Sequence, residues 1–563
     1  MAEDFMTAAV KRVEAQFEKS GVSESCAAFE RKENQIEMRD GVKLHTIYYF
    51  PKEDTAEEKT YPVILTRTCY PGNDRIHRAY GEGLARRGYV YVYQYCRGRE
   101  NSEGKWEPNI NERKDGIDTM NYLVEQPWCE ILGYWGHSYT SMTGWAFADA
   151  AEGKVAAMFL EDYGTDRFTS AYEKGCFRHD ILTAWSMENA EKPVNADYRE
   201  SCRYLPQIEV DEALWGQKVP SYREYITSPN PDAALWQTGW WKQLREIPSK
   251  TKVPIYLLSG WYDHHHGSSM KTWERLNEET KQHSWLEIGA WNHFFQICLE
   301  GKEVMHPQNE EIPKMLEWFE LTLKQKEIPT QRIRAYEIGA DRWMDTVSDG
   351  LGEKGTAGSM TLYLDEKTLR TDTPEQEKKR NYTFDPADPV ESIGGEALLH
   401  TMPQIGSHLQ PEPDYREDVL SFVSEPLEET FTLNGKASVR LFVESDCEDT
   451  AFTAKIMEVT PEGKAYNIRS SIATLEQGKT EAGAYEPGSV AEVQITMWNI
   501  VYTILKGSRI RVDVSSSDFP QYHVHSNQKG LWSEKTENKI AHQTIHTGGV
   551  HASCVILPLM KKQ

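Results

Sequence analysis

The sequence predicts an α/β domain that carries a helical insertion and is followed by an all-β domain. Up to about residue 335, nearly continuous apolar runs alternate with helical patterns, which favours a mostly parallel sheet covered on both faces. Residues 182–250 interrupt this alternation, because they are polar and rich in tryptophan and show no strand pattern. Beyond residue 336, apolar and polar residues alternate with period two, which is typical of half-buried antiparallel strands in a β-sandwich.

The expected elements follow one another from the N-terminus. A first helix is indicated over 8–18, and the Asp40-Gly41 turn predicts an antiparallel hairpin. Helices are expected over 75–87, 115–125 and 142–150. The expected buried strands are 62–66, 89–93, 131–135, 156–160, 254–258 and 284–288.

Four segments result from these patterns. They are the first part of the α/β domain (1–181), a helical cap insertion (182–250), the second part of the α/β domain (251–335) and the all-β domain (336–563). Four glycines between Gly350 and Gly358 predict a flexible connection. Half-buried strands of the all-β domain are predicted from alternate apolar residues, namely Val439, Leu441 and Val443, and Ile510, Val512 and Val514.

Composition excludes several classes of partner. The chain has 563 residues, with 63 Lys and Arg against 87 Asp and Glu, for a net charge of −24. This charge repels phosphate groups, so we expect neither a nucleic acid nor a membrane partner. Nine scattered cysteines without a C-x-x-C pair, and no visible targeting segment, favour free thiols and a cytoplasmic location. A secreted protein with a few disulfides is the alternative, and the sequence leaves open whether the chain forms a homo-oligomer.

The most specific local pattern is Gly136-His137-Ser138-Tyr139-Thr140, between a short apolar strand and a helical segment. A serine on such a turn presents its hydroxyl above the sheet, as in the G-x-S-x-G elbow of α/β-hydrolases. The match is partial because Thr140 occupies the second glycine position. The competing interpretation is a serine that caps a helix.

Chain order supports the hydrolase interpretation. An α/β-hydrolase has its acid and then its histidine downstream of the serine, each in a loop that leaves a strand. Asp263 follows the strand predicted at 254–258, and His293 follows the one predicted at 284–288. Serine becomes a nucleophile when a histidine takes its proton and a carboxylate orients that histidine. The alternative is that Asp263 caps a helix and His293 is a loop residue.

Six short motifs occur along the chain in the order Arg67-Thr68-Cys69-Tyr70, Tyr95-Cys96-Arg97-Gly98-Arg99-Glu100-Asn101-Ser102-Glu103-Gly104, Gln126-Pro127-Trp128, Gly136-His137-Ser138-Tyr139, Gly260-Trp261-Tyr262-Asp263 and Trp291-Asn292-His293. They look like successive motifs of the cocaine-esterase-like hydrolases, which share their architecture with X-prolyl dipeptidyl peptidases and α-amino-acid ester hydrolases. The segment Ser516-Ser517-Asp518-Phe519-Pro520, with Asn527, is similar to the C-terminal jelly-roll domain of that family. The resemblance spans about residues 35 to 560 and implies an α/β-hydrolase fold with a helical cap and a jelly roll.

The resemblance also implies roles for five residues. Ser138 would be the nucleophile, His293 the general base and acid, and Asp263 its orienting partner. The Tyr70 hydroxyl and the backbone N–H of Tyr139 would form the oxyanion hole. Two departures from the family pattern lie near the nucleophile: Thr140, and the missing second glycine in the loop Arg97-Gly98-Arg99-Glu100-Asn101.

Asp263-His264-His265-His266 also invites a metal interpretation, since three imidazoles can bind zinc. Adjacent histidines on an extended loop cannot easily converge on one ion, so we expect no metal and no other cofactor. Loop packing or contacts at the rim of the substrate site are the alternative. Tryptophans of the insertion, among them Trp185, either line a substrate pocket or belong to the core.

Together these observations predict a serine hydrolase that cleaves an ester or activated amide through an acyl-enzyme. Its substrate would be a small ester, an amide or a short peptide. An X-prolyl dipeptidyl peptidase or α-amino-acid ester hydrolase is the first alternative, and it requires carboxylates such as Glu161, Asp162 or Glu173 near the substrate ammonium. A catalytically silent glycan- or partner-binding protein, and a metal hydrolase centred on His264 to His266, are alternatives of other classes.

Overall fold

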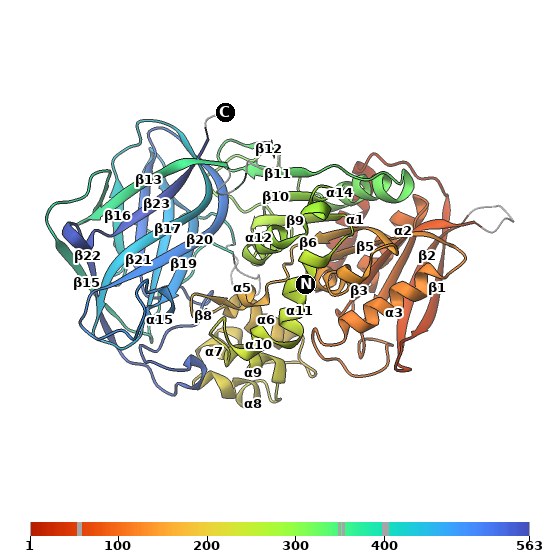
Figure 1. Cartoon of the computed structure of the whole chain (residues 1–563), viewed down its shortest axis with the longest axis horizontal. Helices are drawn as coiled ribbons and strands as arrows, with labels where there is room; N and C mark the ends of the chain where they lie inside the picture. Colours follow the sequence, from red (N-terminus) through yellow and green to blue (C-terminus); the bar gives the residue numbers. More distant parts are fainter. Residues whose placement is uncertain (1, 53–58, 347–350, 352–354, 397–404, 562–563) are drawn as a thin grey trace.

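The computed structural model describes the whole chain except residues 1, 53–58, 347–350, 352–354, 397–404 and 562–563. Figure 1 shows an α/β part on the right, an all-β part on the left, and a group of helices below and between them. The two parts correspond to the predicted fold class. The glycine-rich connection predicted from Gly350 to Gly358 lies partly outside the described residues.

The α/β part is built on a ten-stranded sheet with the order β1-β2-β4-β3-β5-β6-β9-β10-β11-β12. The strands from β4 to β11 in this order are parallel, while β1-β2-β4 and β11-β12 are antiparallel. Their bounds are Ala28–Glu37 (β1), Lys43–Lys52 (β2), Tyr61–Thr68 (β3), Val90–Tyr95 (β4), Cys129–His137 (β5), Val155–Glu161 (β6), Ile255–Tyr262 (β9), Trp285–Asn292 (β10), Arg332–Glu337 (β11) and Arg342–Thr346 (β12).

This sheet extends beyond residue 335, where the sequence analysis ended the α/β domain. The antiparallel hairpin of β11 and β12 continues it to Thr346, because β11 pairs with β10 in parallel register. The expected hairpin at Asp40-Gly41 is confirmed as the connection between β1 and β2.

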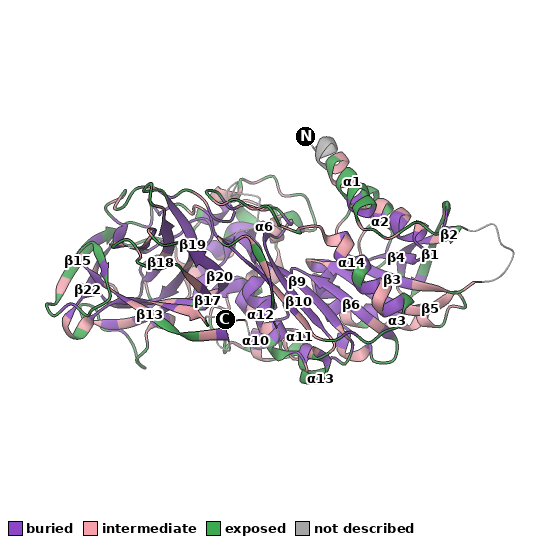
Figure 2. Cartoon of the chain, turned by 90° about the horizontal axis from the view of Figure 1, so that it is seen from above, coloured by how far each residue is buried: buried purple, intermediate pink, exposed green. Residues whose placement is uncertain are grey.

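Helices cover both faces of the sheet. On one face, α1 (Ala2–Lys19), α2 (Asp74–Arg86) and α14 (Glu311–Phe319) pack through residues such as Phe17, Leu84 and Met315. The second core contains Met120 of α3 (Glu112–Val124) and Met142 of α4 (Tyr139–Trp145). This core also includes residues of α11 (Gly239–Lys250) and α12 (His266–Arg275). Figure 2 shows the resulting buried strands, with α1 projecting at the N-terminus.

The helical insertion is confirmed, since residues 182–250 contain no strand. A short hairpin of β7 (Tyr172–Glu173) and β8 (Cys176–Phe177) precedes it, after α5 (Arg167–Ala171). Trp215, Trp236 and Trp241 are buried, so most of its tryptophans belong to the core. Its helices are α6 (His179–Glu188), α7 (Tyr198–Arg203), α8 (Val210–Ala213), α9 (Pro220–Ile226), α10 (Ala234–Gln237) and α11.

The all-β part has strands β13 to β23, connected by hydrogen bonds into one folded network. Their bounds are Thr356–Asp365 (β13), Thr368–Arg370 (β14), Lys378–Phe384 (β15), Leu420–Ser424 (β16), Phe431–Ser445 (β17), Ala451–Val459 (β18), Ala465–Thr474 (β19), Ala491–Ile504 (β20), Arg509–Ser515 (β21), Ala541–Thr547 (β22) and Cys554–Met560 (β23). β17 is a central strand of this network, because it pairs with three others, β20, β22 and β23.

The prediction of half-buried strands is confirmed for β17 and wrong for β21. In β17, Val439, Leu441 and Val443 are buried while the intervening residues are partly exposed. In β21 two of the three alternate polar residues, Arg511 and Asp513, are buried as well. Arg511 donates to Asp513, at 2.8 Å from Nε to Oδ1, and to the carbonyl of Pro411, at 2.6 Å from Nη1. The loop around Pro411 therefore covers the face that the sequence pattern assigned to solvent.

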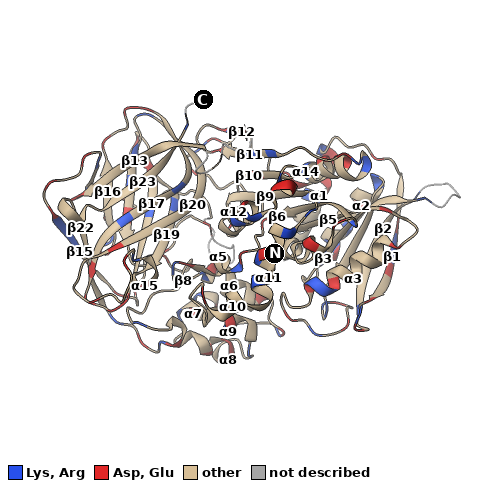
Figure 3. Ribbon diagram, viewed as in Figure 1, with Lys and Arg blue, Asp and Glu red and all other residues tan. Residues whose placement is uncertain are grey.

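Charges of both signs are distributed over both parts of the molecule (Figure 3). All nine cysteines are free thiols, six of them buried. Among the described residues no helix is long and apolar enough to cross a bilayer.

Candidate active site

Three parallel strands end at one edge of the sheet and place the predicted site residues there. Ser138 follows β5, Asp263 follows β9 and His293 follows β10. These strands and β6 are neighbours in the order β5-β6-β9-β10. Because the carboxyl ends of parallel strands meet at one edge, side chains 30 to 155 residues apart in sequence come together there.

The backbone turns sharply at Ser138. This residue has φ 57° and ψ −125°, a conformation that is costly for a residue with a side chain. Its N–H donates to the carbonyl of Glu161 on β6, at 3.0 Å. A Cβ atom on Gly136 would lie 2.1 Å from the carbonyl oxygen of Thr140, so this position requires glycine. The turn has the geometry of a nucleophile elbow.

Thr140, which replaces the usual second glycine, supports the turn through its hydroxyl. The Oγ1 atom accepts the N–H of His137 at 2.6 Å and donates to the carbonyl of the same residue at 2.7 Å. The elbow is thus closed by a side chain. No pattern based on glycine spacing alone predicts this role.

A chain of hydrogen bonds joins the serine, the histidine and the carboxylate. His293 Nε2 lies 2.9 Å from Ser138 Oγ, and His293 Nδ1 lies 2.5 Å from Asp263 Oδ2. The other carboxylate oxygen of Asp263 accepts the backbone N–H of His265 at 2.7 Å. Asp263 and His293 are both buried. The structure therefore brings together all three residues that the sequence singled out.

Tyr70 and Tyr139 lie beside this chain. The Tyr70 hydroxyl accepts the indole N–H of Trp185, at 3.4 Å from Nε1, and Ser138 is among the groups that interact with it. Burial raises the pKa of Tyr70, so its hydroxyl keeps its proton and is able to donate. Tyr139 is the first residue of α4, and an N–H in the first turn has no acceptor within its own helix.

Trp185 connects the cap to the site. Its ring stacks on Tyr139, with centroids 5.7 Å apart and an interplanar angle of 10°. The side chain of Tyr139 is fixed by a hydrogen bond to Glu112 Oε1 at 3.0 Å. The sequence identified Trp185 only as one of several tryptophans in the insertion. Its position in α6, beside Tyr70 and Tyr139, could not be derived from spacing.

His137 and Asp162 flank the chain on its other side, and the sequence assigned no role to His137. The Nε2–H of His137 donates to the backbone carbonyl of His293 at 2.9 Å. Asp162 Oδ2 lies 3.6 Å from the same nitrogen. Asp162 is fully buried, follows β6 directly and has φ 48°. His137 thus connects the serine turn to the loop that carries the histidine.

The pKa values of these two residues are shifted by burial. Burial, and then the neighbouring negative charge of Asp263, raise the pKa of Asp162 well above its ordinary value. Burial lowers the pKa of His137. Burial therefore favours the neutral forms of both His137 and Asp162.

The three consecutive histidines point to different neighbours. The ring centroid of His264 lies 4.1 Å from that of His293, His265 Nδ1 lies 2.9 Å from Ser170 Oγ, and His266 packs on Trp261. All three are buried, and burial lowers their pKa values. Only His264 belongs to a group of potential metal ligands among the described residues, together with Asp263 and His293.

The other acidic candidates have structural partners. Glu161 accepts the indole N–H of Trp135 at 3.0 Å and is fully buried beneath the elbow. Burial raises the pKa of Glu173 to about 6, and Trp498 of the all-β part is among its partners. Of the three carboxylates considered for an ammonium site, Asp162 is the one close to Ser138 and His293.

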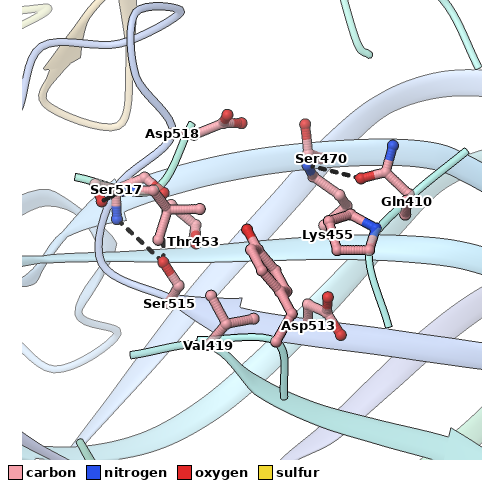
Figure 4. Close-up of a pocket in the computed structure, with 13 residues that line it drawn as sticks. Gln410, Val419, Thr453, Lys455, Ser470, Asp513, Ser515, Ser517 and Asp518 are labelled. Carbon is pink, nitrogen blue, oxygen red and sulfur yellow. Dashed lines mark hydrogen bonds between the residues drawn. The ribbon is translucent and has the colours of Figure 1, made fainter. Parts of the chain in front are cut away.

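A separate hollow lies in the all-β part (Figure 4). Its lining includes Lys455, Asp513 and Asp518, together with Ser515 and Ser517. No histidine is among its lining residues, so these serines have no adjacent base of the kind that serves Ser138.

Comparisons with known proteins identify related domains in both parts of the chain. Residues 40–295 match the family model described as X-Pro dipeptidyl-peptidase (S15 family). Residues 329–556 match the X-Pro dipeptidyl-peptidase C-terminal non-catalytic domain. The chain is 27% identical to cocaine esterase from Rhodococcus sp. (strain MB1 Bresler) over 574 residues, which cover 94% of this chain and 98% of that protein.

Two solved structures share the whole architecture. An α-amino acid ester hydrolase has a TM-score of 0.82 at 21% identity, covering 95% of this chain and 97% of that one. An aminopeptidase from the marine sediment archaeon Thaumarchaeota archaeon has a TM-score of 0.81 at 21% identity, covering 95% and 96%. At this identity the likeness establishes the fold.

The fold and the family matches define a serine hydrolase with an α/β catalytic domain and a C-terminal all-β domain. The two domain matches and the full-length match to cocaine esterase support a CocE/NonD-like hydrolase that is related to the X-Pro dipeptidyl peptidases.

The raised pKa of Asp162 predicts a pH-dependent effect of Asp162→Asn on stability. The unfolded chain releases this proton near pH 4, whereas the folded protein retains it to higher pH. Above about pH 4, folding is therefore coupled to the uptake of a proton. For this reason the free energy of unfolding of the wild type falls as the pH rises. We expect the variant to unfold at a higher temperature than the wild type at pH 7, with a difference that disappears toward pH 4.

Asp414→Asn is the control with opposite sign. Although burial alone would raise it, the pKa of Asp414 is lowered to about 2, mainly by hydrogen bonds from Lys367, the backbone of Ser421, and Arg380. This carboxylate stabilises the fold above about pH 4, and the effect is lost as the pH falls toward 2. Asp414→Asn should thus be less stable than the wild type at pH 7. If both variants changed the unfolding temperature at pH 7 in the same direction, the opposite pKa shifts of Asp162 and Asp414 would be contradicted.

Proposed function

We propose that this protein hydrolyses small esters or activated amides through an acyl-enzyme, with Ser138, His293 and Asp263 as its catalytic triad. The observation that carries the proposal is the hydrogen-bonded chain from Ser138 Oγ through His293 to Asp263, at 2.9 and 2.5 Å. These contacts match the roles of nucleophile, base and orienting acid.

In the first half-reaction, Ser138 Oγ attacks the substrate carbonyl carbon while His293 Nε2 takes the hydroxyl proton. Asp263 holds Nδ1–H and stabilises the imidazolium that forms. The tetrahedral intermediate collapses when His293 protonates the leaving alcohol or amine. Water then attacks the acyl-enzyme, again with His293 as base, and the carboxylic acid is released.

Tyr70 and the N–H of Tyr139 are the proposed oxyanion donors. A phenol with a raised pKa remains a neutral donor, and an N–H at the first turn of α4 is free to donate to a ligand oxygen. Such donors act strongly where water is excluded, because the charge that develops on the oxygen is poorly screened there. Trp185 would cover this side of the site and exclude water from it.

The family match gives a second candidate, cleavage of X-proline peptides or α-amino-acid esters. That activity needs a negative charge facing the substrate ammonium. Asp162 is the carboxylate near the reacting groups, yet burial favours its neutral form. We therefore place simple esters first. Separately, we infer a cytoplasmic location from the free thiols.

A fluorophosphonate probe tests the nucleophile directly. The wild type should be labelled at one serine, and Ser138→Ala should lose both labelling and nearly all activity, with kcat reduced by roughly 10⁵ to 10⁶. Ser141→Ala is the matched control, because Ser141 is buried on α4, the helix that directly follows Ser138, and its Oγ has no hydrogen-bond partner among the described residues. Labelling of folded Ser138→Ala would refute the assignment of Ser138 as the nucleophile. Absence of labelling in the folded wild type would favour a silent protein, and activity that survives in Ser138→Ala but is lost with a chelator would favour a metal hydrolase.

Tyr70→Phe tests the oxyanion hole. Removing one donor typically costs about 10² to 10³ in kcat, and we expect a fall of this size with little change in KM. Circular dichroism and the unfolding temperature should stay close to those of the wild type, since the aromatic ring is retained. An unchanged kcat would remove Tyr70 from the mechanism.

Substrate comparison separates the two candidate activities. We expect kcat/KM for aryl esters of apolar acids to exceed that for proline dipeptide anilides by at least about tenfold, or roughly 1.4 kcal/mol. Blocking the amino group of an α-amino ester should leave its turnover unchanged. Efficient anilide turnover that requires a free ammonium would reverse the order of the candidates while retaining Ser138.

A further inference from the structure

Two histidines and a glutamate converge at one end of the all-β part, away from the serine site along the chain and in the fold (β15 and β22 in Figure 1). Glu377 precedes β15, His546 lies in β22, and His551 ends the short helix that follows, Gly549–His551. Glu377 Oε1 lies 3.1 Å from Nδ1 of His546 and 3.1 Å from Nδ1 of His551.

His546 lies between two carboxylates. Its Nδ1 faces Glu377, and its Nε2 lies 3.2 Å from Glu444 Oε2, so both ring nitrogens face carboxylates. A neutral imidazole has only one N–H, so one of these contacts would bring two acceptors together. His546 is 1% exposed, so bulk water cannot supply the missing donor. A cation in place of the Nδ1 proton would satisfy both contacts.

We propose that Glu377, His546 and His551 bind a divalent transition-metal ion of the Zn²⁺ type. Zinc lies about 2.0 to 2.2 Å from imidazole nitrogen and carboxylate oxygen, which places neighbouring ligands of a tetrahedral site about 3.3 Å apart. Two of the three ligand separations, both 3.1 Å, are close to this edge length, and all three ligand atoms lie within 4.8 Å of one another. Glu377 and His551 are partly exposed, so an ion has access and water fills the fourth position.

Glu444 has the role of an outer carboxylate. A metal-bound histidine usually donates its other ring N–H to a carboxylate, which fixes the tautomer and raises the basicity of the ligand nitrogen. Glu444 accepts from Nε2 of His546 in this geometry. Lys379 Nζ lies 3.3 Å from the same carboxylate and offsets part of its charge. The net charge of −24 favours cation binding in general.

The backbone holds His551 in place without the metal. Gly548 and Gly549 have φ of 75° and 57°, and Gly549 N donates to the carbonyl of Pro374 at 2.8 Å. A Cβ on Gly548 would lie 2.3 Å from the carbonyl oxygen of Gln376. This tight glycine turn brings His551 back beside His546, with ring centroids 5.4 Å apart. The ligands come from three segments, so a bound ion would stabilise this end of the domain.

Calorimetric titration of the full-length protein with ZnCl₂ tests the proposal. His551→Ala and Glu377→Gln should each weaken the site at least about tenfold while the protein remains folded, because both side chains are partly exposed. His542→Ala is the matched control. His542 is an exposed histidine of the same strand that pairs with a single carboxylate, Asp446, at 2.7 Å, and its loss should leave binding unchanged.

Two further readouts complete the test. Co²⁺ should give the visible absorption of a four-coordinate site in the wild type but not in His551→Ala, and Zn²⁺ should raise the unfolding temperature of the wild type only. Fluorophosphonate labelling of Ser138 should be the same in all variants. The proposal is overturned if Zn²⁺ does not bind, or if it binds equally to wild type and variants. It is also overturned if the stability difference between wild type and His551→Ala changes with pH but not with Zn²⁺. That result would mean that the cluster contains a protonated His546 and no metal ion.

Discussion

The parallel pairing of β5, β6, β9 and β10 is the constraint on which the site depends. It aligns four strand ends and turns residues distant in sequence into neighbours. The pairing of Tyr262 with Asn292 places Asp263 beside His293. Close approach of β9 and β10 requires Gly260, where a Cβ would lie 2.1 Å from the carbonyl oxygen of Trp291. A small residue in the sheet thus determines the spacing of the acid and the histidine.

Strain and burial at the strand ends are compensated by hydrogen bonds. Ser138 has an unfavourable backbone conformation, and its N–H is anchored to β6 while Thr140 closes the turn. His137 joins this turn to the histidine loop. Because the neighbouring Asp162 is favoured in its neutral form, a second carboxylate is accommodated without competing for His293. The elbow, the acid and the base therefore form one connected unit.

The cap and the all-β part complete the environment of this unit. Trp185 stacks on Tyr139 and donates to Tyr70, so the cap contributes to the proposed oxyanion side. Arg178, just before α6, is buried and donates to the backbone carbonyl of Glu396 at 2.7 Å, which ties the insertion to the all-β part. The position of the cap beside Tyr70 and Tyr139 thus depends on contacts with both other parts.

The sequence by itself determined the class of fold, because periodicity reflects how many faces of a strand or helix are buried. It also predicted Ser138, Asp263 and His293 as a group, since each follows a recognisable strand and their order is characteristic. It did not predict that β21 is buried on both faces, that Thr140 closes the elbow, or that Trp185 and His137 contact the site. Likewise, Glu377 and His546 are 169 residues apart. These features depend on which segments pack together, and only the tertiary structure decides that, because local sequence patterns carry no information about the partner segment.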